Sequence, residues 1–96
     1  MSPLSEPLSP TVVRSALRVI LASGEVIFSG HAMREMENDG ITQAAVIRIL
    51  RSGTAEPAEF ERGSWRYRIR AMKAYAVVSF RSESSAVVVT AWRAAR

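Results

Sequence analysis

The sequence predicts an α+β fold, with two to three N-terminal helices packed on one face of a three- to four-stranded antiparallel sheet. Before residue 53, apolar residues recur every three to four positions, as they do along amphipathic helices. From Thr54 onward, apolar and polar residues alternate, as they do along strands. The turns between the alternating segments are short, and short turns join antiparallel neighbours.

The N-terminal residues 1–9 are rich in proline and serine, so we expect a flexible tail before a single domain over residues 10–96. Ser9 is a suitable N-cap, and Pro10 suits the first helical position. The apolar residues that follow predict a helix, which Gly24 ends. We expect residues 25–28 to form a short extended link.

Two more helices are expected before the sheet. Ser29 is the N-cap of a short helix over residues 30–38, and Asn38-Asp39-Gly40 ends it because these residues tolerate left-handed backbone. Thr42 caps the third helix, and Gly53 closes it.

The second half of the chain predicts up to four strands. Residues 56–60 are expected at an edge, because Pro57 has no backbone donor. Residues 65–71 alternate throughout, so Arg66, Arg68 and Arg70 share one face of their strand. Residues 74–81 and 85–93 complete the sheet. Because unpaired arginines do not fit an apolar core, the three arginines must line the face that the helices leave open, or an edge.

Composition excludes several classes of protein. The chain has no cysteine, which removes disulfides and thiolate chemistry and fits a cytoplasmic location. No apolar run is long enough to span a membrane, and the N-terminus lacks the pattern of a secretory signal. We find no glycine-rich phosphate loop, no paired-carboxylate signature and no metal-ligand cluster, so neither cofactor nor metal is expected.

The net charge of +4 is concentrated in one half of the chain: residues 1–50 carry −1 and residues 51–96 carry +5. Twelve of the thirteen basic residues are arginine, whose planar fork suits phosphate. This favours an anionic partner, with nucleic acid first. The alternative is an ordinary solubilising surface.

The row of three arginines sharpens this prediction. Alternate residues of a strand lie about 7 Å apart, close to the phosphate spacing of a nucleic-acid strand. Alternatively, the arginines pair with Glu59, Glu61 or Glu83 on a solvated face. Three aromatic residues of the same half either stack on bases or belong to the core: Trp65, Tyr75 and Trp92.

The second helix carries the only histidine, His31, on one polar face with Arg34, Glu35 and Asn38. Near a helix N-terminus a histidine is favoured in its neutral form, which suits a general base. Alternatively, His31 only packs and hydrogen-bonds locally, and Arg34 pairs with a carboxylate such as Glu37 or Glu56.

These segments resemble a known family. The stretch Phe28-Ser29-Gly30-His31-Ala32-Met33-Arg34-Glu35-Met36 and the later Gly40-Ile41-Thr42 resemble the bacterial family called domain of unknown function 4258. Three strand segments agree with it: Arg66-Tyr67-Arg68, Val77-Val78-Ser79-Phe80 and Val88-Val89-Thr90-Ala91-Trp92-Arg93. That family is similar to RelE-type and MqsR-type toxins and is grouped with the barnase–EndoU–colicin–RelE superfold of metal-independent ribonucleases. The resemblance implies a RelE-like fold with RNA lying on the basic face of the sheet.

The leading hypothesis is therefore a toxin-like, metal-independent ribonuclease. His31 is its expected base, Arg34 and Arg68 complete the catalytic group, and Tyr67 or Tyr75 would serve as the acid. Further RNA contacts are expected from Arg66, Arg70, Lys73, Arg81, Thr90 and Arg93. The expected partners are RNA and an antitoxin protein. The alternative is a non-catalytic module that binds nucleic acid or a protein on the same face.

Overall fold

Three helices form where the sequence places an N-cap before an apolar stripe: α1 (Pro10–Ser23), α2 (Gly30–Asp39) and α3 (Gln43–Ser52). In the computed structural model, which describes residues 5–94, the side-chain oxygens of Ser9, Ser29 and Thr42 each accept a backbone hydrogen bond from the helix that follows. Gly40 ends α2 with a φ of 69°, in the left-handed region. None of these helices of residues 5–94 has the length and apolar character to cross a membrane.

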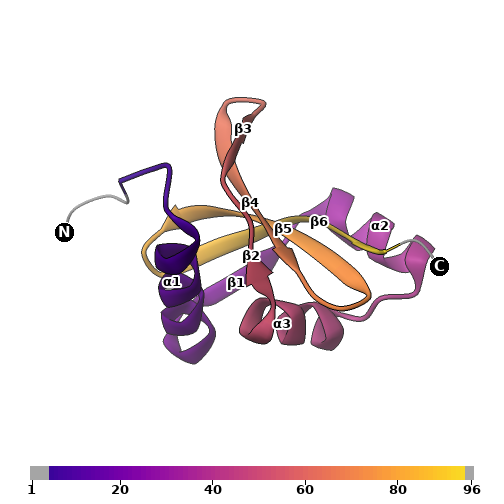
Figure 1. The fold of residues 1–96 in the computed structure, drawn as a ribbon. Helices are drawn as coiled ribbons and strands as arrows, with labels where there is room; N and C mark the ends of the chain where they lie inside the picture. The colour runs from indigo at the N-terminus through magenta and orange to yellow at the C-terminus, as the bar shows by residue number, and fades with distance from the viewer. Residues whose placement is uncertain (1–4, 95–96) are drawn as a thin grey trace.

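The sheet has six strands and is mostly antiparallel (Figure 1). In chain order these are β1 (Glu25–Phe28), β2 (Thr54–Ala55), β3 (Glu59–Glu61), β4 (Ser64–Arg70), β5 (Ala74–Ser82) and β6 (Ser85–Arg93). The order across the sheet is β1-β6-β5-β4-β2, and β3 pairs with β4 alone. Helices α1 and α3 lie against one face (Figure 1). The predicted α+β class, with helices packed on a sheet, is confirmed.

Residues 25–28 form a strand where the sequence predicted only a link. Strand β1 pairs in parallel with β6, from Glu25 opposite Ser85 to Phe28 opposite Val88. Helix α2 then continues along the outer edge of β6. A hydrogen bond from Ser29 Oγ to the Val89 carbonyl, at 3.1 Å, attaches the start of the helix to this strand. Four residues are too few to show an alternating pattern, and the partner strand is distant in sequence, so this pairing left no local signal.

The predicted strand over residues 56–60 is divided into β2 and β3, on either side of Pro57. Glu56 still pairs with β4, since its backbone N–H donates to the Arg68 carbonyl at 2.9 Å. Beyond the proline, β3 and β4 form a hairpin that projects from the rest of the molecule (Figure 1). This break leaves the Glu56 side chain beside the middle of β4, where it becomes part of the candidate site.

Tyr67 lies in the core between the sheet and the helices and is fully buried. Its hydroxyl accepts a hydrogen bond from Leu8 N at 3.1 Å and donates to Glu6 Oε2 at 2.8 Å. Burial raises the pKa of Tyr67 to about 12, so the phenol is neutral at physiological pH. Of the predicted tail, residues 1–4 lie outside the described residues, whereas the segment over residues 5–9 contacts this core.

Candidate nucleic-acid interface

The predicted row of arginines forms on β4. Arg66, Arg68 and Arg70 alternate with the fully buried Tyr67 and Ile69, so they project from the face of the sheet opposite α1 and α3. The register of β4, β5 and β6 adds four residues to this face. We call it the arginine face, and it comprises Arg66, Arg68, Arg70, Tyr75, Val77, Thr90 and Trp92.

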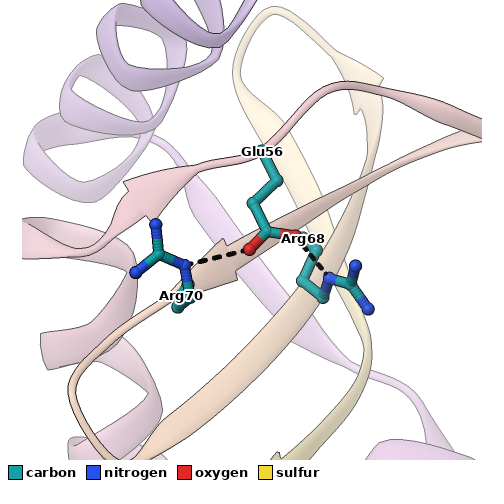
Figure 2. A network of polar contacts seen from close by, with 3 residues as sticks. All are labelled: Glu56, Arg68 and Arg70. Carbon is teal, nitrogen blue, oxygen red and sulfur yellow. Dashed lines mark hydrogen bonds and ion pairs between the residues drawn. The ribbon is translucent and has the colours of Figure 1, made fainter.

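Glu56 bridges two of these arginines (Figure 2). Its Oε1 accepts a hydrogen bond from Arg68 Nε at 2.7 Å, and its Oε2 accepts one from Arg70 Nε at 3.0 Å. The hydrogen bond from Arg68, with further help from Arg70, holds the pKa of Glu56 below its ordinary value, although partial burial opposes this effect. Glu56 in turn raises the pKa of Arg68. We call this arrangement the Glu56 bridge.

The bridge occupies only one nitrogen of each guanidinium. In residues 5–94, the Nη atoms of Arg68 and Arg70 have no hydrogen-bond partner. Figure 2 shows these ends pointing away from the carboxylate on its two sides. Each arginine therefore presents free amino donors to an outside anion, in an orientation that the carboxylate has already set. Because the two ends diverge, the arrangement suits two separate anionic groups.

A hollow of about 240 Å³ lies on the arginine face next to Arg68. Its lining consists of Glu59, Glu61, Arg66, Arg68, Val77, Thr90 and Trp92. We call it the Arg68 hollow. Glu61 Oε1 lies 3.9 Å from Arg66 Nη1, a separation too long for a hydrogen bond. Residues 5–94 contain no group of three or more His, Cys, Asp or Glu side chains placed to hold a metal ion.

Aromatic rings adjoin the bridge. The Arg68 guanidinium carbon lies 5.6 Å from the centre of the Tyr75 ring, within the range of a cation–π contact. Tyr75 is stacked on Trp92, with ring centres 5.1 Å apart and planes inclined by 19°. Both rings are half-buried on the arginine face. Trp65 lies on the opposite side of β4, where it contacts Phe60 and the core.

The arginine face is less basic than the sequence suggested. Three carboxylates, those of Glu56, Glu59 and Glu61, adjoin its three arginines, so the formal charges balance. Pairing with Glu61 was among the predicted alternatives. Glu56 was not predicted as the partner of this row, although antiparallel pairing across Pro57 could have indicated it.

The structure does not bring the three predicted catalytic residues together. His31 and Arg34 are exposed on α2, beside the outer edge of β6. Two strands, β6 and β5, separate α2 from Arg68 on β4. At the usual strand spacing β6 alone is about 10 Å from β4, and α2 lies beyond β6. The predicted acid Tyr67 is buried on the other face, whereas Tyr75 is on the arginine face.

The remaining predicted RNA-binding residues are dispersed. Arg93 lies on the helix side, where its Nε donates to the Asp39 carbonyl at 2.8 Å and its Nη2 donates to the Gly40 carbonyl at 3.1 Å. These contacts satisfy carbonyls at the end of α2. Lys73 is exposed in the β4–β5 turn, and Arg81 is exposed near the other end of β5. Of these residues, Thr90 lines the Arg68 hollow beside the β4 arginines.

Replacing Glu56 with glutamine is expected to lower the free energy of unfolding by about 1 kcal/mol at neutral pH, because charge-assisted hydrogen bonds are lost. The folded-state pKa of Glu56 is below the ordinary value of 4.5. The bridge therefore stabilises the fold above that value and loses its contribution as the pH falls through the lower folded-state pKa. Urea unfolding should show the largest difference at neutral pH and a shrinking one below pH 4.5. A difference that is independent of pH contradicts this role, and the exposed Glu83→Gln is the matched control.

The comparison with protein families finds a match over most of the chain. A family model described as Domain of unknown function (DUF4258) matches residues 28–93. The matched region runs from the end of β1 to the end of β6, and it contains the whole arginine face. No curated protein and no solved structure matches the chain.

Proposed function

Since the chain belongs to the DUF4258 family, whose description names no activity, we propose its function from its geometry together with its sequence resemblance: it is a toxin-like, metal-independent ribonuclease that binds RNA on the arginine face. The Glu56 bridge is the observation that carries the RNA-binding part of this proposal. It orients Arg68 and Arg70 before any ligand arrives, so little side-chain entropy is lost when an anion binds.

Single-stranded RNA suits this face better than a duplex. Its successive phosphates are spaced similarly to alternate residues of a strand, about 7 Å apart. Arg68 and Arg70 occupy such alternate positions, and their free ends diverge as two neighbouring phosphates require (Figure 2). Single strands also leave their bases free to contact aromatic side chains such as Tyr75 and Trp92.

Cleavage is supported by a different observation, the resemblance of residues 28–42 and the later strands to the relatives of RelE-type and MqsR-type toxins. In such chemistry the guanidinium of Arg68 would stabilise the charge that develops on the phosphate. A toxin of this kind acts on cytoplasmic RNA, and its antitoxin would cover the arginine face.

One observation favours the second candidate, a non-catalytic module that binds nucleic acid or a protein. The three carboxylates beside the three arginines give the face equal numbers of negative and positive groups. Such a face is complementary to a protein surface that also carries negative and positive groups. His31 lies two strands away from Arg68, so the predicted base does not adjoin the phosphate-binding residues.

The test is to incubate the purified protein with single-stranded RNA in buffer containing EDTA. We expect cleavage, its loss in an Arg68→Ala, Arg70→Ala double variant, and its retention in Arg48→Ala. Arg48 is exposed on α3, on the other side of the sheet. Salt-sensitive RNA binding without cleavage would establish the non-catalytic module, and absence of RNA binding would overturn both RNA-based functions.

A further inference from the structure

The three carboxylates beside the β4 arginines differ in their contacts. Glu56 is engaged by Arg68 and Arg70 through both of its oxygens. Glu61 lies at the end of β3, and its nearest cation is Arg66 at 3.9 Å. Glu59 lines the Arg68 hollow, yet it has no hydrogen bond and no ion pair with any side chain of residues 5–94. Its carboxylate is therefore available to a ligand.

The backbone directs Glu59 towards the same face as the arginines. Glu59 pairs directly with Arg66 in the β3–β4 hairpin, and paired residues of antiparallel strands project to the same side. Glu59 is also close enough to Arg68 to favour the charged form of that guanidinium. The hollow thus places a free carboxylate next to the arginine that is proposed to bind a phosphate.

We propose that Glu59 is the general base of RNA cleavage, an inference that rests on the proposed ribonuclease function. The Glu59 carboxylate takes the proton from a ribose 2′-hydroxyl whose 3′-phosphate is bound by Arg68. The 2′-oxygen forms a bond to phosphorus, and the bond from phosphorus to the 5′-oxygen of the next nucleotide breaks. That 5′-oxygen takes a proton from water. The products are a 2′,3′-cyclic phosphate and a free 5′-hydroxyl.

The size and lining of the hollow fit this assignment. Its 240 Å³ corresponds to about eight water molecules, which is enough space for a ribose ring. The charged groups facing Glu59 are Arg66 and Arg68 from β4 and Glu61 from its own strand, whereas β5 and β6 contribute only Val77, Thr90 and Trp92. The Thr90 hydroxyl supplies a further hydrogen-bonding group for the sugar or the phosphate.

The experiment compares Glu59→Gln with the unaltered protein under single-turnover conditions in EDTA. Loss of a general base is expected to lower the cleavage rate about 100-fold or more. Binding of a 2′-O-methyl RNA, which cannot be cleaved, should stay within about threefold or tighten, because a negative charge is removed. Glu59→Asp keeps the carboxylate and should retain more activity than the glutamine variant. The rise of rate with pH on the acidic side should also disappear in Glu59→Gln.

The charge-matched control is Glu83→Gln, which is exposed in the β5–β6 turn and should cleave like the unaltered protein. If the unaltered protein cleaves RNA and Glu59→Gln cleaves it equally well, the assignment of Glu59 is overturned and the ribonuclease function stands. If Glu61→Gln loses activity and Glu59→Gln does not, the assignment is also overturned. If the unaltered protein binds RNA without cleaving it, the ribonuclease function fails, and the role of Glu59 fails with it.

Discussion

Replacing Arg68 with alanine is expected to weaken the binding of single-stranded RNA about 10- to 100-fold and to abolish detectable cleavage. A charge-assisted hydrogen bond contributes about 1.5–3 kcal/mol, and each 1.4 kcal/mol corresponds to a factor of ten in affinity. Arg68 lies at the centre of the arginine face, since it contacts Glu56, lies over the ring of Tyr75 and lines the Arg68 hollow. Loss of the Arg68 side chain also leaves Glu56 paired with Arg70 alone. The electrostatic potential where a phosphate would bind then becomes more negative, which disfavours phosphate binding.

Fluorescence anisotropy with a short 2′-O-methyl RNA measures this effect without interference from cleavage. Arg68→Lys keeps the charge but lacks the planar fork, so its affinity should fall between those of the unaltered protein and the alanine variant. The slope of log affinity against log salt concentration should become shallower by about 0.7 in Arg68→Ala, because one phosphate contact is lost. Arg48→Ala should bind RNA normally. Equal affinities of Arg68→Ala and the unaltered protein would contradict the proposed interface.

Replacing Gly24 with alanine is expected to lower the free energy of unfolding by about 2–3 kcal/mol, in the upper part of the range for overpacked sites. A Cβ atom at this position would lie 2.4 Å from the Ser84 carbonyl oxygen and 3.0 Å from Ile20 Cα. Both of these are backbone atoms, so no side chain can move aside. Gly24 also precedes the first hydrogen bond of β1, in which Glu25 N donates to the same Ser84 carbonyl at 2.9 Å.

Urea or thermal unfolding provides the measurement, with Gly30→Ala as the control. A Cβ atom on Gly30 would meet only Arg34 Nη1 at 3.6 Å, an ordinary contact. Alanine is also the better helix former, so Gly30→Ala should be neutral or slightly stabilising. If Gly24→Ala is as stable as the unaltered protein, the close approach of α1 to the β5–β6 turn is not a constraint on the fold.

Local patterns predicted the elements that local interactions form. The three helices begin at Ser9, Ser29 and Thr42 because a hydroxyl oxygen there accepts a backbone hydrogen bond, and this chemistry is visible in the sequence. Strand β1 was not predicted, because its pairing with β6 joins residues that are distant in sequence. For residues 56–60 the sequence predicted a single edge strand. It did not predict that this strand would be divided at Pro57. The secondary-structure propensities of the residues also do not reveal how far the β3–β4 hairpin projects from the sheet.

The candidate site was also predicted only in part, because local patterns place some of its residues and pairing between strands places the others. Strict alternation along β4 predicted that its arginines share a face, and the register of the sheet bears this out. Glu56 was missed as a partner of the arginines, because its position depends on pairing between strands rather than on a motif, whereas Glu59 was considered only as a partner that would neutralise them. Arginine is a residue type that binds phosphate, but the Arg93 side chain instead donates hydrogen bonds to two backbone carbonyls at the end of α2. Sequence alone does not distinguish these two roles of an arginine.

The binding of RNA to the arginine face is tested most directly by NMR titration of the ¹⁵N-labelled protein with a short, single-stranded 2′-O-methyl RNA. We expect the backbone amides around Arg68, Val77 and Thr90 to shift, and those of α1 and α3 to remain in place. Shifts that are confined to α1 and α3, or no shifts at all, would contradict the proposal that RNA is held on this side of the sheet.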